Sequence, residues 1–234
     1  MITHEWNYHY NLEGKEWIRQ NLVYTPYISP DKKTMCMSFN RDPHYHVWPE
    51  ENALWTNELL TDRFAREVTF HEIARKASIP TLKIQDINVF KREIYIEWHG
   101  DDFLMQGLNN GGYDKVLPNW QAQWLDRITE MWQAGIYKFS LHPNSWVAVD
   151  GVLTPYNWFF SFKKDEPKIK IRDLLIQISI ERQDKLQLML NHYNMDLDTP
   201  YDIRTVQLIC FNSFRSNYPD SLIDQALKNQ LVNI

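Results

Sequence analysis

The stretch of sequence from Leu141 to Trp158 reads LHPNSWVAVDGVLTPYNW and decides the fold expected for this chain. Two short apolar runs, 146–149 and 152–156, flank the dipeptide Asp150-Gly151. Asp-Gly between such runs is typical of a tight hairpin turn, because both turn positions require a positive φ. The stretch therefore predicts a β-hairpin.

The part of the chain that precedes this stretch predicts strands around one long helix. Aliphatic and aromatic runs at 17–28 and 34–39 flank the turn-forming cluster 29–33, which predicts another β-hairpin. Residues 56–77 carry apolar side chains near helical spacing, which predicts a helix of about five turns. It should end before Pro80, because proline disfavours helical geometry in the preceding residue. Short β-like runs follow at 81–89 and 93–98.

The second half is expected to be mainly helical. Trp and aliphatic side chains from Asn119 to Ala134 share one helical face, so this part should open with a helix there. Further helical stretches are expected near 171–193 and 202–214. The pair Asp101-Asp102 beside a turn and the charged run 163–170 are both expected to be solvated surface.

Composition limits the classes of partner. The chain has 234 residues and 44% hydrophobic content, enough for one large domain or two small lobes. Its net charge of -5 provides no overall field for phosphate backbones or anionic lipid, so nucleic acid is not an expected partner. Cys36 and Cys210 each lie in an apolar run, which favours buried side chains over a disulfide or metal site.

The chain also lacks the patterns of export and membrane insertion. Residues 1–6 show no basic region followed by an apolar run, and no stretch of about 18 apolar residues occurs. We therefore expect a cytoplasmic protein. The glycine-poor composition, with its Lys, Asn and Ile content, would suit a gene from a phage or another AT-rich genome.

Residues 141–158 resemble the catalytic and metal-binding loops of aminoglycoside phosphotransferase-like and other small-molecule kinases. In that family the pattern is H-x-D-L-H-P-x-N, a short strand, D-G, another strand, then I-D-F or I-D-W. Upstream, Arg66-Glu67 and the residues that follow, as far as Thr81, look like the helix that carries the ion-pairing Glu and its turn. Residues 94–98, with Gly100 after them, are similar to the hinge that meets the adenine.

The resemblance implies an α+β, bilobal protein kinase-like fold. Residues 1–98 would form a reduced, strand-rich N-terminal lobe with one long helix. Residues 99–234 would form a helical C-terminal lobe, and the two lobes together would make one kinase-like domain.

The aligned catalytic positions carry replacements. Phosphoryl transfer depends on positioning and on neutralisation of charge by metal ions and cationic groups. The acceptor-activating Asp of the family falls on Ser140, whose neutral hydroxyl cannot replace a carboxylate as proton acceptor. The metal-holding Asn falls on Ser145, or on Asn144 with a shift of one residue. The second metal-holding Asp falls on Asn157, which is uncharged. We therefore expect no catalytic residue and no bound metal.

The N-terminal positions depart from the family as well. The sheet Lys should lie within residues 34–39, where Met35, Cys36, Met37 and Ser38 stand. Glu67 then lacks its usual partner. Gly14 is the only glycine before Gly100, and one glycine cannot line a pyrophosphate with close backbone amides.

With these replacements, the resemblance implies at most a remnant of the nucleotide-binding cleft. Its expected residues are Glu67, Glu97 and Trp98, where a nucleotide would bind weakly and no cofactor is implied. The histidines of His44-Tyr45-His46, with His142, could supply metal ligands, but solvated loop histidines are favoured because no acidic or Cys partner has ligand spacing.

The leading hypothesis is a catalytically inactive kinase-like protein, a pseudokinase, that acts as a binding or scaffold module for another protein. One alternative is a divergent small-molecule phosphotransferase that uses Asp150, His142 or Glu130 in place of the missing groups. Another is a structural or assembly protein.

Overall fold

The computed structural model describes residues 7–8, 11–12, 15–16, 24–39, 63–171, 188, 190–212, 215 and 217–232. The strands in these ranges are β1 (Asn7–Tyr8), β2 (Asn11–Leu12), β3 (Lys15–Glu16), β4 (Thr25–Ile28), β5 (Thr34–Ser38), β6 (Ile84–Asn88), β7 (Glu93–Glu97), β8 (Ile136–Lys138), β9 (Trp146–Val149), β10 (Val152–Pro155), β11 (Ser161–Lys163), β12 (Ile169–Lys170) and β13 (Pro200–Tyr201). The helices are α1 (Arg63–Lys76), α2 (Phe103–Asn110), α3 (Tyr113–Val116), α4 (Trp120–Gln133), α6 (Ile203–Asn212) and α7 (Asp220–Val232), with the 3₁₀ helices η5 (Pro143–Ser145) and η6 (Trp158–Phe160).

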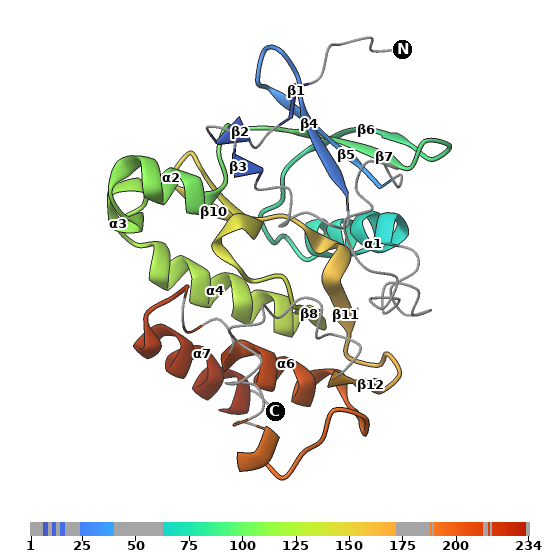
Figure 1. Cartoon of the computed structure of the whole chain (residues 1–234), viewed down its shortest axis with the longest axis vertical. Helices are drawn as coiled ribbons and strands as arrows, with labels where there is room; N and C mark the ends of the chain where they lie inside the picture. The colour runs from blue at the N-terminus through green and yellow to red at the C-terminus, as the bar shows by residue number, and fades with distance from the viewer. Residues whose placement is uncertain are drawn as a thin grey trace.

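The first part of the chain forms a five-stranded antiparallel sheet in the order β1-β4-β5-β7-β6. The predicted hairpin around residues 29–33 is confirmed over the described residues, with Ile28 opposite Met35. Strand β5 lies inside the sheet, so Met35 and Met37 are buried, with 1% and 0% of their surface exposed. The sheet lies at one end of the molecule, and α4, α6 and α7 lie at the other (Figure 1).

Helix α1 connects two hydrophobic cores. Near its start Phe64 packs on Phe39 of the sheet side, with ring centroids 6.0 Å apart. Further along, Phe70 and Ala74 belong to the second core, which they share with α4. The helix ends at Lys76, and Ser78 takes a left-handed φ of 60°. The predicted end before Pro80 is therefore confirmed.

The second part of the chain opens differently from the prediction. Helices α2 and α3 precede α4, and the expectation that the helix from Asn119 comes first is wrong. Asp102 caps α2 by accepting a hydrogen bond from the backbone amide of Met105 at 2.9 Å. It is fully buried, so the expectation that both members of Asp101-Asp102 are solvated is wrong for Asp102. Gly111, with φ of 75°, ends the helix.

The hairpin predicted around Asp150-Gly151 is confirmed as β9 and β10. Both turn residues have positive φ, 50° and 78°, as a tight two-residue turn requires. Side-chain amides from two helices form hydrogen bonds with the backbone groups at both outer edges of this hairpin. Gln106 of α2 exchanges hydrogen bonds with the amide and carbonyl of Ala148, and Gln123 of α4 accepts from the amide of Leu153 and donates to the carbonyl of Gly151. The two glutamines take the place of neighbouring strands.

Replacement of Gln123 by Leu should destabilise the fold by about 1–3 kcal/mol, because the amide of buried Leu153 loses its acceptor. Equilibrium unfolding in urea measures this cost. The matched control is Gln121→Leu, on the same helix but exposed, which should change stability by less than about 0.5 kcal/mol. Equal effects of the two substitutions would contradict the role of the amide.

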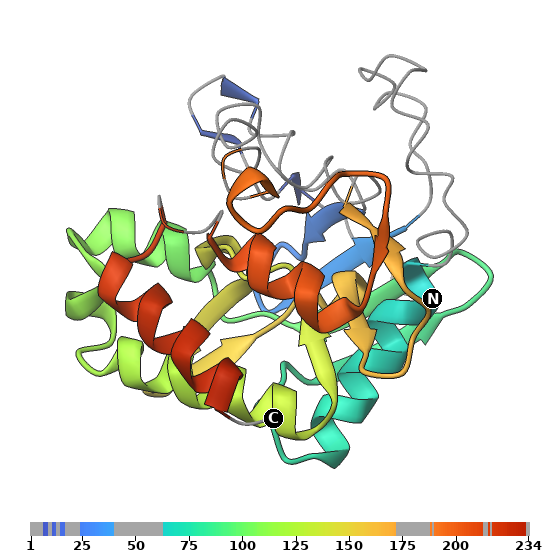
Figure 2. The same cartoon turned by 90° about the horizontal axis from the view of Figure 1, so that it is seen from below.

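The C-terminal helices pack as a group. Helix α4 contacts α7, and α7 contacts α6, so the three cover one side of the second part (Figure 2). Trp124 and Trp146 are buried in this core, with ring centroids 6.5 Å apart. The predicted helix from 119 to 134 and the one near 202–214 are confirmed as α4 and α6 over the described residues.

Several predictions fall partly or wholly outside the described residues. They are the early parts of the first hairpin run and of the first helix, most of the helical stretch 171–193, the side chain of Cys210, Gly14 and the histidine pair His44 and His46. Within the described part of the chain, none of the helices combines the length and apolar character needed to cross a bilayer.

Candidate functional site

The three positions that the resemblance aligns with catalytic residues meet in one largely buried polar cluster, which consists of Tyr24, Glu67, Lys138, Ser140, Ser145 and Asn157. Asn157 lies at its centre. This residue adopts the left-handed conformation, with φ of 61° and ψ of 59°, directly before η6. Asn is among the few residues that tolerate this region, so the backbone can turn here without glycine.

Other members of the cluster form hydrogen bonds with both the backbone carbonyl and the side-chain amide of Asn157. Its backbone carbonyl accepts hydrogen bonds from Lys138 Nζ at 2.6 Å and from Ser140 Oγ at 2.7 Å. Its side-chain Oδ1 accepts from the hydroxyl of Tyr24 at 2.6 Å, and its Nδ2 donates to Ser145 Oγ at 3.4 Å. The oxygen that would face a metal ion in the family pattern is therefore bonded to a tyrosine hydroxyl.

Lys138 is one of two members of the cluster, with Tyr24, that the sequence analysis missed. It ends β8 and is fully buried. Its Nζ also donates to Ser140 Oγ at 2.7 Å and lies 5.3 Å from the ring centroid of Trp158. A lysine between Tyr137 and Phe139 in an apolar strand is a signal that could have indicated a buried amine, because lysine is rarely buried without a partner.

Glu67 enters the cluster from α1. Its side chain is 3% exposed, and Oε2 accepts a hydrogen bond from the backbone amide of Phe159 at 2.6 Å. Burial raises the pKa of Glu67, while the charge of Lys138 opposes the rise. Burial likewise lowers the pKa of Lys138, and the charge of Glu67 opposes that shift. The carboxyl group predicted to lack its sheet lysine thus interacts with a lysine from another element.

Tyr24 contributes a neutral hydroxyl. It precedes β4, is 3% exposed, and lies against Phe39 and Phe159 with ring centroids 5.4 and 6.1 Å away. Burial raises its pKa well above the usual value, and the charges of Glu67 and Asp102 raise it further. Tyr24 therefore stays protonated and donates to Asn157.

The remaining candidates lie apart from these hydrogen bonds. Glu97 ends β7, where its Oε1 lies 3.8 Å from His99 Nε2. Trp98 is buried against Tyr156, with ring centroids 5.6 Å apart. The predicted group of Glu67, Glu97 and Trp98 is thus divided, with Glu67 alone in the polar cluster.

The alternative catalytic residues are placed elsewhere as well. Asp150 is exposed in the β9–β10 turn, and Glu130 forms an ion pair with Arg127 on α4 at 2.9 Å. His142 caps η5 by accepting from the amide of Asn144 at 3.2 Å. Among the side chains that the structure describes, no three His, Cys, Asp or Glu residues form a group that could hold a metal ion.

A sheet followed by α1, and then helices around the β9–β10 hairpin, make this an α+β protein, as the sequence predicts. No protein-family model matches the sequence, and no curated protein is similar to it.

Solved structures of WbdD are similar to the chain. A structure of the bifunctional kinase-methyltransferase WbdD has a TM-score of 0.49 at 8% identity, and the match covers 98% of this chain and 51% of that one. A structure of monomeric WbdD also has a TM-score of 0.49 at 8% identity, with coverage of 88% and 48%. The chain spans about half of the length of these structures.

Proposed function

We propose that this chain is a catalytically inactive kinase-like protein that acts as a binding or scaffold module for another protein. The observation that carries the proposal is the closed set of hydrogen bonds among Ser140, Ser145 and Asn157 with Tyr24 and Lys138. These groups satisfy one another inside the protein. A phosphotransferase would need them directed at substrate and metal.

Charge supports the same proposal. A metal ion that carries a nucleotide needs carboxylate ligands, and Asn157 offers an amide oxygen that already accepts a hydrogen bond. The buried carboxylate of the cluster, Glu67, binds the backbone amide of Phe159. Lys138, when protonated, would repel a metal ion at this position. We further propose that residues 1–98 and 99–234 are the two lobes of this module.

The test is a thermal-shift titration with ATP, GTP and ADP, each with and without Mg²⁺. Ligand that binds only the folded state raises stability by RT ln(1 + [L]/Kd), so a site with a Kd of about 0.1 mM would gain about 2.7 kcal/mol at 10 mM nucleotide. We expect no Mg²⁺-dependent shift. An active aminoglycoside phosphotransferase in the same assay serves as the positive control.

A clear Mg²⁺-dependent rise in Tm would contradict the proposal and favour the divergent phosphotransferase. In that case Asp150→Asn and Glu130→Gln would identify the group that replaced the missing base, through loss of phosphoryl transfer to the acceptor.

A further inference from the structure

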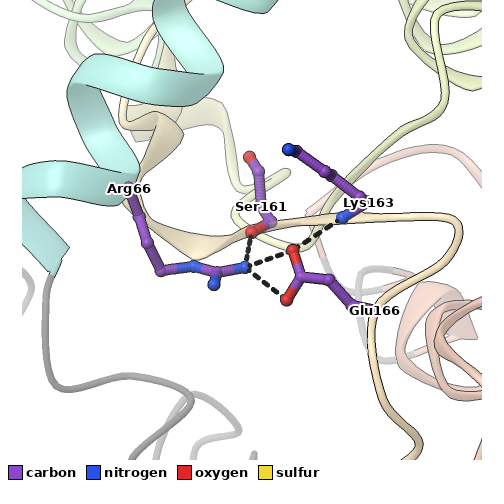
Figure 3. Close-up of polar contacts among 4 residues, drawn as sticks. All are labelled: Arg66, Ser161, Lys163 and Glu166. Atoms are coloured by element: carbon purple, nitrogen blue, oxygen red, sulfur yellow. Dashed lines mark hydrogen bonds and ion pairs between the residues drawn. The ribbon is translucent and has the colours of Figure 1, made fainter.

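Two adjacent residues of α1 reach the same segment of the second part of the chain. Glu67 binds the amide of Phe159, as described above. Its neighbour Arg66 donates through one terminal nitrogen to the carbonyl of Ser161 and to both carboxylate oxygens of Glu166, at 2.9 and 3.0 Å (Figure 3). Both side chains therefore connect α1 to residues 157–166.

The contact between Arg66 and Glu166 differs from an ordinary surface ion pair. The two side chains are 17% and 15% exposed, so solvent screens their charges less than at an open surface. The guanidinium of Arg66 lies 5.3 Å from the ring centroid of Phe70 and 4.8 Å from that of Phe162. These rings help to hold the orientation of the guanidinium.

Glu166 is fixed from its own side too. Its Oε1 accepts a hydrogen bond from the backbone amide of Lys163 at 2.9 Å, which closes the turn between β11 and β12 (Figure 3). The expectation that residues 163–170 are simply a solvated loop is therefore incomplete, because one acidic residue of this run turns inward to α1.

We infer that the contacts of Arg66 and Glu67 join α1 and residues 157–166 into one rigid body, and we call these contacts the clamp. The ion pair between Arg66 and Glu166 is the more solvent-exposed contact of the clamp. Asn157 and Phe159 both lie in the clamped segment, so the polar cluster is held in place by the fold itself. This arrangement needs no nucleotide or modification to order α1. The inference concerns the mechanics of the fold and stands whether or not the chain binds a nucleotide.

Hydrogen exchange of the full chain tests the coupling with Glu166→Gln. This substitution keeps the shape of the side chain and removes its charge. If the clamp is one unit, amides in a peptide over 157–162, including the Phe159 amide that Glu67 binds, should exchange about tenfold faster or more. The matched control is Glu72→Gln, on the same helix, where Glu72 pairs with exposed Arg75. It should leave exchange over 157–162 unchanged.

A second variant keeps the test decisive. Arg66→Lys retains the positive charge but loses the planar guanidinium that lies over Phe70 and Phe162, so it should accelerate the same amides. Faster exchange confined to residues 163–168 in both variants would overturn the inference, because the outer contact would then be local. An equal acceleration over α7 would also overturn it, since the effect would be global and not carried by the clamp.

Discussion

Replacement of Lys138 by Met should destabilise the fold by about 3–5 kcal/mol at pH 8. The substitution removes the buried lysine whose positive charge opposes the rise in the pKa of Glu67, so the buried carboxylate would lose that stabilising charge. It also removes the donor to Ser140 Oγ and to the carbonyl of Asn157. Met is apolar and close to Lys in length, so the cavity left behind is small.

The loss of stability caused by Lys138→Met should increase as pH rises. Burial raises the pKa of Glu67 in the folded state, and without Lys138 nothing of opposite charge opposes that rise. A carboxyl group with a raised folded pKa binds more protons when folded, so stability falls as pH rises from the unfolded value of about 4.3 to the folded value. The variant should be least impaired near pH 5.

Urea unfolding at pH 5, 6, 7 and 8 measures both effects. Lys164→Met is the control, because Lys164 is exposed in the β11–β12 turn and its loss should leave stability nearly unchanged. A cost below about 1 kcal/mol at pH 8, or a cost that does not vary with pH, would contradict a charged Lys138 as the partner of Glu67.

Replacement of Glu67 by Gln should destabilise the fold by about 3 kcal/mol near neutral pH. Gln can still accept the hydrogen bond from the Phe159 amide, so the main loss is the negative charge that faces Lys138. Lys138 is then the uncompensated buried ion. Burial lowers its pKa in the folded state, and the loss of Glu67 lowers that pKa further.

The pH dependence of this second variant should have the opposite slope. A lysine with a lowered folded pKa binds fewer protons when folded, so stability rises with pH between the folded value and the unfolded value of about 10.4. The deficit should shrink from pH 7 to pH 10. Unfolding of the double variant Glu67→Gln/Lys138→Met completes the cycle, and its cost should be smaller than the sum of the single costs.

In the unsubstituted protein the two slopes should largely cancel. A carboxyl group and an amine together bind one proton whether both are charged or both are neutral, so the stability of the protein with both groups present should change little around neutral pH. Additive costs in the cycle, or parallel slopes for the two single variants, would show that the two groups act independently.

Local sequence patterns predicted the strands of both hairpins, strands β6 and β7, and helices α1, α4 and α6. Asp150-Gly151 supplies the positive φ angles of the β9–β10 turn, and the periodic Trp residues of α4 define its buried face. Helix α2 escaped prediction although its signals were present, since Asp102 is its N-cap and Gly111 ends it. Adjacent Asp residues beside a glycine are typical of a turn as well, and the pattern alone did not separate the two.

The candidate site was predicted only in part. Alignment to a family pattern placed Ser140, Ser145 and Asn157 at equivalent positions, and the structure brings all three together. The pattern could not indicate Tyr24, because its contact to Asn157 crosses 133 residues of sequence. Lys138 falls on the first His of the pattern H-x-D-L-H-P-x-N, but the pattern could not indicate that this lysine is buried and donates to the carbonyl of Asn157.

The sequence by itself determined the predicted turns, the helix faces and the residue types at the aligned positions, because these depend on neighbours within a few positions. Only the tertiary structure decided which groups surround Ser140, Ser145 and Asn157. Burial and charge effects depend on residues that the chain brings together from afar: Glu67 from α1, Lys138 from β8 and Tyr24 from just before β4. The lack of a lysine within residues 34–39 was therefore readable in the sequence, whereas the influence of Lys138 on the pKa of Glu67 required the fold.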